Sequence, residues 1–113
     1  MTESVPDPAV AAAATARVPT SSASRYLQQL CKHWSHNLAV RFTPEQGEVV
    51  FPREGRAGIF PEDATVTFVA EPEALVVRIA ASTPAQCAAL QDVVARHLDR
   101  FAFREAPLAF DWR

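Results

Sequence analysis

The chain has 113 residues, of which 49% are hydrophobic and 21% are charged, and it carries a formal net charge of −2. Such a composition is ordinary for a globular domain, and two domains of half this length would each be too small to bury a stable core. The 11 basic residues are scattered among 13 acidic ones. This pattern argues against a nucleic-acid-binding surface, which needs a block or stripe of positive charge.

Residues 1–13 contain neither an aromatic residue nor an alternating pattern, and they are predicted to form a disordered leader before a single α+β domain over residues 14–113. The alanine-rich stretch is too weakly apolar for a signal peptide, and no run approaches the roughly 20 apolar residues of a membrane span. We therefore expect a cytoplasmic protein that does not bind a membrane. In that reducing compartment Cys31 and Cys87 should remain thiols.

The first elements in chain order are a short strand and a helix. Residues 15–20 alternate weakly and predict an edge strand, where a proline at position 19 is tolerated. The hydroxyl groups that follow can cap a helix over residues 22–36. Its apolar positions recur three or four residues apart and form one stripe: Leu27, Leu30, Cys31, Trp34 and Leu38. Asn37 can end the helix, because asparagine tolerates the left-handed cap conformation.

The middle of the chain alternates apolar and polar residues in four stretches, as half-buried strands do. They form two consecutive hairpins: residues 38–43 with 48–52, and residues 65–70 with 74–80. Residues 53–63, between the hairpins, contain two glycines and a proline and are predicted to be a loop. A serine, a threonine and a proline at 82–84 begin a second helix that runs to Phe101. Residues 108–112 alternate again and predict a final strand.

Two consecutive hairpins imply an antiparallel sheet, and two amphipathic helices suffice to cover one of its faces. The sequence therefore predicts an α+β fold, a two-layer sandwich in which an antiparallel sheet of four to five strands carries both helices on one face. If the helices pack side by side, the imidazoles of His33 and His97 should approach each other across the seam between them. Close imidazoles disfavour simultaneous protonation, so the pair should titrate as a coupled unit.

Two segments carry a family resemblance. Residues 24–33 read Ser-Arg-Tyr-Leu-Gln-Gln-Leu-Cys-Lys-His, and residues 97–105 read His-Leu-Asp-Arg-Phe-Ala-Phe-Arg-Glu ahead of Phe-Asp-Trp at 110–112. Over residues 14–113 the chain resembles the bacterial domain of unknown function 2218 family. The resemblance implies an association with siderophore-interacting flavin reductases and with iron metabolism. It therefore implies a non-enzymatic binding or interaction module that has such a reductase as its partner.

A second interpretation is a small metal-binding protein. Cys31, His33 and His36 follow the pattern C-x-H-x-x-H, and thiolate and imidazole ligands suit a transition metal such as zinc, copper or iron. At about 100° per residue, Cys31 and His33 point roughly 160° apart on a helix, whereas His33 and His36 are about 60° apart. The geometrically reasonable ligands are therefore His33 and His36 together with His97 from the facing helix. The competing interpretation is that the cysteines are small core residues and that the histidines lie at the edges of the apolar helix stripes.

The second helix carries a candidate anion-binding or partner-binding face. Arg96, Arg100 and Arg104 recur every four residues along it, and a phosphate or a siderophore carboxylate is the ligand that such a face would bind. Asp92 and Asp99 lie close enough along the helix to pair with these arginines. Such pairing favours a solvated, partly neutralised surface instead.

Catalysis is the third interpretation, and the residues favour it least. Cys31 lies in the buried stripe, where burial makes a thiol unreactive, and neither Ser24 nor Ser35 has an evident base. The sequence contains no phosphate loop and no dinucleotide-binding fingerprint. No cofactor other than a transition metal is implied.

Overall fold

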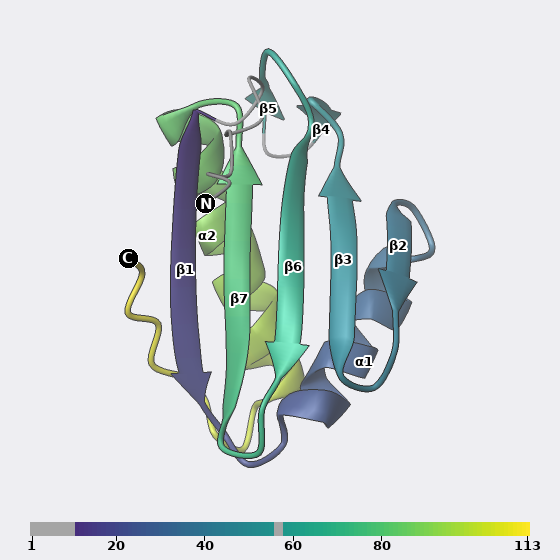
Figure 1. Cartoon of the computed structure of the whole chain (residues 1–113), viewed down its shortest axis with the longest axis vertical. Coiled ribbons are helices and arrows are strands. Elements are labelled where there is room, and N and C mark those ends of the chain that lie inside the picture. Colours follow the sequence, from purple (N-terminus) through teal and green to yellow (C-terminus); the bar gives the residue numbers. More distant parts are fainter. Residues whose placement is uncertain (1–10, 56–57) are drawn as a thin grey trace, which may run out of the picture.

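The computed structural model describes residues 11–55 and 58–113. Its elements in chain order are β1 (Ala12–Pro19), α1 (Ala23–Trp34), β2 (Ala39–Phe42), β3 (Gln46–Phe51), β4 (Glu54–Gly55), β5 (Gly58–Ile59), β6 (Ala64–Ala70), β7 (Ala74–Ala81) and α2 (Pro84–Phe101). Five strands form one antiparallel sheet in the order β1-β7-β6-β3-β2, and β4 pairs with β5 separately. Both helices lie behind this sheet in Figure 1, so the predicted two-layer α+β sandwich is confirmed.

The core lies between the sheet and the two helices. Every second residue of the central strands points into it, and the fully buried ones include Val49, Val66, Phe68, Val77 and Ile79. The helix stripes supply the facing side chains, among them Leu27, Leu30, Leu90 and Leu98. Removing one such side chain from water stabilises the fold by roughly 1.5–3 kcal/mol. This burial is the reason why the spacing of apolar residues predicts the elements.

Helix α2 begins as the sequence predicts. Thr83 is its N-cap, and the hydroxyl oxygen accepts a hydrogen bond from the backbone N–H of Gln86 at 3.0 Å, with Pro84 in the first turn. The Gln86 side chain is buried, and its oxygen accepts from the backbone N–H of Ser82 at 2.7 Å while its amide donates to the carbonyl of Glu62 at 2.9 Å. These bonds tie the loop before β6 to the start of the helix.

The first strand begins earlier than the sequence pattern predicts. In β1, Ala12 pairs with Ala81 and Ala13 pairs with Ala80. The pattern of residues 1–13 assigns both alanines to the leader, because a run of alanines shows no alternation. Their small side chains nevertheless fit beside the alanines of β7, so the strand includes them. Residues 1–10 of the predicted leader lie outside the described residues.

Helix α1 ends at Trp34, two residues before its predicted end. The backbone N–H of Ser35 still bonds to the carbonyl of Cys31 at 2.9 Å, whereas that of Asn37 bonds to Trp34, only three residues back, at 3.1 Å. A turn therefore follows the helix, and His36 lies in it. None of the helices that the structure describes is long and apolar enough to cross a membrane.

Two further segments differ from their predictions. The region 53–63, predicted as a loop, contains the short β4–β5 hairpin, in which Glu54 pairs with Ile59. The C-terminal tail, predicted as a strand, makes a single strand-like pairing in which Thr15 and Arg113 exchange two backbone hydrogen bonds of 2.9 and 2.8 Å. The tail runs along the outer edge of β1 in Figure 1. Its residues Leu108, Phe110 and Trp112 are partly buried and pack against the core.

Candidate functional site

The two helices meet at a seam, where the ring of His33 from α1 lies beside the ring of His97 from α2. Their ring centroids are 5.3 Å apart and their planes are tilted by 47°. Nδ1 of His97 lies 2.7 Å from the carbonyl oxygen of Val93. A carbonyl only accepts, so Nδ1 carries the proton, and Nε2 of the neutral ring is left as an acceptor. The predicted approach of the two imidazoles is confirmed.

Aromatic side chains pack against the histidine pair on the side that faces the core. The ring centroid of Trp34 lies 5.2 Å from that of His97 and 6.3 Å from that of His33. Phe101 lies edge-on to His33 with the centroids 5.7 Å apart. Trp34 is buried, His97 is half-buried and His33 is exposed. The pair is therefore held by the core on one side and open to solvent on the other.

The surroundings of His33 favour its neutral form. Partial burial lowers the pKa of its imidazole below 6.5, and the charges of His97, Arg100 and His36 lower that pKa further. Since each of these neighbours is a cation when it is charged, a second proton at the seam is opposed by repulsion. Near neutral pH His33 is consequently available to accept a hydrogen bond or to bind a metal ion.

The three-histidine metal site expected from the sequence is not assembled. Because α1 ends at Trp34, His36 lies in the turn that follows the helix. Among the residues described, no group of three or more His, Cys, Asp or Glu side chains is placed to hold a metal ion. The helix geometry brings together two of the three predicted ligands, His33 and His97.

A cleft of about 300 Å³ adjoins the histidine pair at the end of the seam where α1 begins and α2 ends. We call it the seam cleft, and its lining residues are Arg25, Tyr26, Gln29, Phe101, Phe103 and Arg104. The guanidinium carbon of Arg25 lies 5.3 Å from the centre of the Tyr26 ring, and that of Arg104 lies 5.7 Å from the centre of the Phe103 ring. Phe103 is 71% exposed. The seam cleft therefore combines aromatic surface with positive charge.

The predicted arginine face is divided in the structure. Arg96 forms an ion pair with Asp92 at 2.9 Å, whereas Arg100 and Arg104 form no ion pair within the described residues. Asp99, which could have neutralised Arg100, accepts a hydrogen bond from a backbone N–H of the tail instead. Arg104 follows the end of α2, so a turn and not the helix positions it. Of these two arginines, Arg104 lines the seam cleft.

A carboxylate fixes one wall of the seam cleft. The hydroxyl groups of Tyr26 and Thr20 both donate to the carboxylate of Glu105, in the latter case at 3.0 and 3.2 Å. These bonds hold the segment after α2, which contains Phe103 and Arg104, against the start of α1. Sequence patterns do not reveal this cluster, because Tyr26 and Glu105 are 79 positions apart and neither belongs to a recognisable motif.

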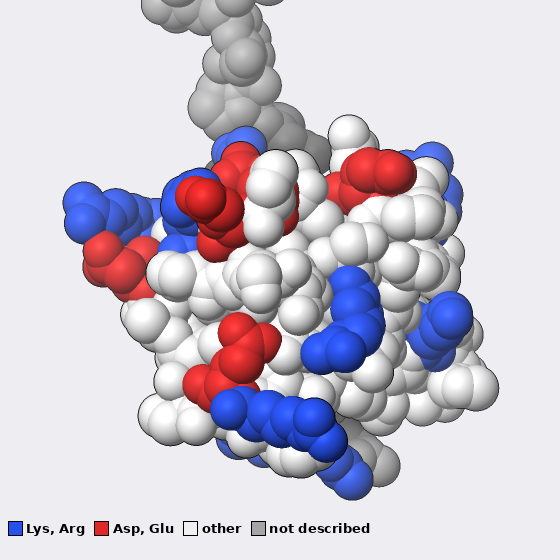
Figure 2. Space-filling view, turned by 90° about the horizontal axis from the view of Figure 1, so that it is seen from below, with Lys and Arg blue, Asp and Glu red and all other residues white. Residues whose placement is uncertain are grey.

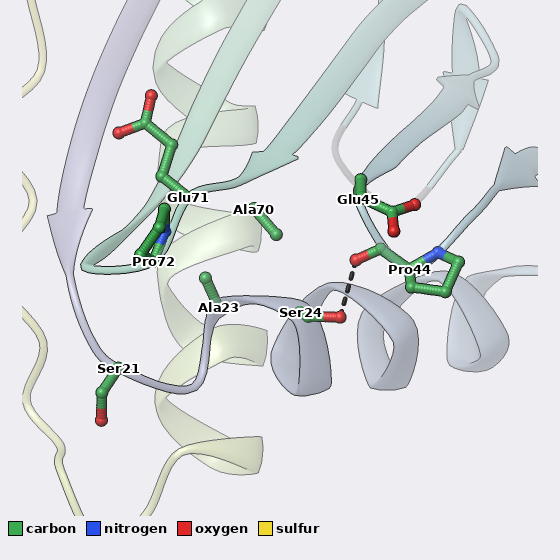
Figure 3. Close-up of a pocket in the computed structure, with 8 residues that line it drawn as sticks. All are labelled: Ser21, Ala23, Ser24, Pro44, Glu45, Ala70, Glu71 and Pro72. Atoms are coloured by element: carbon green, nitrogen blue, oxygen red, sulfur yellow. Dashed lines mark hydrogen bonds between the residues drawn. The ribbon is translucent and has the colours of Figure 1, made fainter.

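A second cavity of about 300 Å³ lies beside the first turn of α1, and Figure 3 shows the residues that line it. Two of its polar groups already have partners: the hydroxyl of Ser24 donates to the carbonyl of Pro44 at 2.6 Å, and the carboxylate of Glu71 pairs with Arg17 at 3.0 Å. A second carboxylate, that of Glu45, also lines the cavity. This cavity is therefore a weaker candidate for a ligand site than the seam cleft.

Charge is mixed over the end of the molecule where α1 begins. Seen from below in Figure 2, some lysine and arginine side chains stand beside acidic ones, and others stand apart from them. The ion pairs account for part of this mixture, for example Arg17 with Glu71. This distribution suits recognition of a small anion at a local site more than a broad polyanion surface.

Neither cysteine belongs to the candidate site. Cys31 is fully buried and Cys87 is buried as well, in agreement with the sequence prediction. Burial raises the pKa of the Cys31 thiol to about 11, so that the thiolate forms only in strongly alkaline solution.

We expect both thiols to resist iodoacetamide in the native protein at pH 8, because alkylation requires an accessible thiolate. In denaturant, both Cys31 and Cys87 should be modified within minutes. Mass spectrometry of the intact protein measures the difference. Rapid native labelling of either thiol would contradict the burial that the structure shows.

A family model described as "Uncharacterized protein conserved in bacteria (DUF2218)" matches residues 15–113. Among solved structures, the chain is similar to the NMR structure of PA4090 from Pseudomonas aeruginosa. The two sequences are 32% identical, the match covers 89% of this chain and 94% of that chain, and the TM-score is 0.68. No curated protein matches. With nearly its whole described length matched, the chain belongs to the bacterial DUF2218 family.

Proposed function

We propose that this protein is a non-enzymatic binding module that acts in iron or siderophore metabolism in the cytoplasm, with the seam cleft as its ligand site and a siderophore-interacting flavin reductase as its partner. The link to iron and to the reductase rests on the family resemblance. The observation that supports a binding role is the positive charge of Arg25 and Arg104 in the seam cleft, with Arg100 beside the histidine pair. None of these three arginines forms an ion pair within the described residues.

The side chains of the seam cleft favour a small carboxylate ligand. A guanidinium group presents paired N–H donors that match the two oxygens of a carboxylate. Tyr26, Phe101 and Phe103 add aromatic surface beside these donors, so an aromatic ring in the ligand can pack in the same cleft. A siderophore that carries carboxylate or catechol groups combines both features, and such a ligand fits a volume of about 300 Å³ only in part. The rest of it would extend into solvent or toward the partner protein.

A titration of the isotope-labelled protein with citrate and with 2,3-dihydroxybenzoate tests this proposal. We expect the backbone amide signals of Arg25, Gln29, Phe103 and Arg104 to move in a saturable manner. Replacing Arg104 with alanine should weaken binding about 10- to 100-fold, because a hydrogen bond to a charged group contributes about 1.5–3 kcal/mol.

Arg96→Ala is the matched control, since Arg96 lies on α2, before the turn that carries Arg104, and already pairs with Asp92. Its affinity for either probe should equal that of the wild type. The proposal fails if neither probe shifts the seam signals at millimolar concentration. It also fails if Arg96→Ala weakens binding as much as Arg104→Ala does, because the charge of the whole surface would then be responsible.

A further inference from the structure

We propose that His33 and His97 form a two-histidine site for a divalent transition-metal ion, with the remaining coordination positions open to solvent. The two imidazoles come from different helices, and their ring centroids lie 5.3 Å apart. A ring nitrogen lies about 2.0–2.1 Å from a bound zinc ion, which places each ring centroid about 3.2 Å from the metal and two centroids about 5 Å apart in a tetrahedral site. The observed separation agrees with this geometry.

The hydrogen bonding of His97 prepares it to bind a metal. Its Nδ1 donates to the carbonyl oxygen of Val93 at 2.7 Å, one helical turn earlier. Metal-binding histidines commonly donate one ring N–H to a carbonyl or carboxylate, which fixes the tautomer and the ring orientation. Nε2 of His97 thereby keeps the lone pair that can bind a metal ion.

The packing around the pair limits how far the rings can move. Trp34 is buried and contacts both imidazoles, and Phe101 lies edge-on to His33. A site whose ligands are already oriented loses less conformational entropy on binding. The exposed side of His33 provides an entry path for the ion.

The charges around His33 affect the metal in two opposite ways. Arg100, together with His36 and His97 when these are protonated, repels a dication and therefore weakens binding. The same cations, with partial burial, keep the His33 imidazole unprotonated near neutral pH, and a metal binds only the unprotonated ring. Cys31 does not join the site, because it is buried in the core on another side of α1. We therefore expect a site of modest affinity that takes a borderline metal such as Zn²⁺, Ni²⁺ or Cu²⁺.

Calorimetric titration of the untagged full chain with ZnCl₂ at pH 7.5 tests the site. We expect one Zn²⁺ per chain, and the ring signals of His33 and His97 should move together. His33→Ala and His97→Ala should each weaken binding at least about tenfold, since even changes in the outer shell of a metal site cost 10- to 100-fold. Affinity should also fall in acid, because protons compete with the metal for the same nitrogen atoms.

His36→Ala is the matched control, because this third histidine lies in the turn after α1 and its loss should not weaken zinc binding. Dispersed amide spectra must show that each variant is folded, and the exposed position of His33 makes His33→Ala the safest of them. Absence of binding at millimolar zinc would overturn the proposal. An equal loss in His36→Ala would overturn it as well and would favour a site with three histidines. Because citrate binding at the seam cleft needs neither histidine, its outcome is separate from this one.

Discussion

Replacing Phe68 with alanine is expected to lower the free energy of unfolding by about 3–5 kcal/mol, because the substitution removes a large ring from a fully packed core. Phe68 lies on the central strand β6 and is completely buried. Its ring stacks on that of Trp34 with the centroids 6.1 Å apart and the planes 24° from parallel. Trp34 in turn supports both imidazoles of the seam. The variant should therefore loosen the histidine pair as well as destabilise the fold.

Urea unfolding followed by tryptophan fluorescence measures this effect. Phe103→Ala is the matched control, since it deletes the same atoms from a ring that is 71% exposed, and its loss should stay within about 0.5 kcal/mol. Domains of this size are stable by only about 5–15 kcal/mol, so Phe68→Ala removes a large share. A loss below about 1 kcal/mol would show that the core around β6 collapses onto the missing ring.

The elements that the sequence predicts well are those in which burial sets the spacing of apolar residues. The stripe of α1, with Leu27, Leu30 and Trp34, lies on the core, and so does every second residue of β6 and β7. The cap at Thr83 is likewise local, because the bond joins residues three positions apart. Each of these signals depends on neighbours in the chain, and a single sequence contains all of them.

The elements that the sequence misses depend on partners that are distant in the chain. Ala12 and Ala13 belong to β1 only because β7 offers alanines opposite them. The end of α1 at Trp34 depends on where the chain must turn to enter β2, and no apolar spacing marks that position. His36 consequently lies in the turn after α1, and among the described residues no group of three ligand side chains is placed to hold a metal ion.

The candidate site likewise has one part that the sequence predicts and one part that it does not. The pairing of His33 with His97 could be predicted, because both lie at the edges of stripes on helices that cover one sheet face. The seam cleft could not, because it depends on Phe103 and Arg104, which follow the end of α2. The carboxylate of Glu105 fixes that segment through contacts with residues near the start of the chain.

After Phe68→Ala, the second largest loss of stability is expected when a single methyl group is added at Gly47. A Cβ atom built there would lie 2.7 Å from Sγ of Cys31 and 3.5 Å from Cδ2 of Leu27. Both of these side chains are fully buried, so neither has free space to move into. Gly47→Ala should therefore lower the free energy of unfolding by about 1–3 kcal/mol, which is the usual cost of overpacking a core. Thermal or urea unfolding measures it.

Gly55→Ala provides the control, because nothing lies within 4 Å of the Cβ position at Gly55. A double-mutant cycle then identifies the clash. In a Cys31→Ala background the sulfur is gone, and the added methyl group of Gly47→Ala should cost clearly less than it does beside Cys31. Equal costs in the two backgrounds would show that the destabilisation comes from the strand backbone. In that case the close packing of β3 on α1 would not be the reason why this position requires glycine.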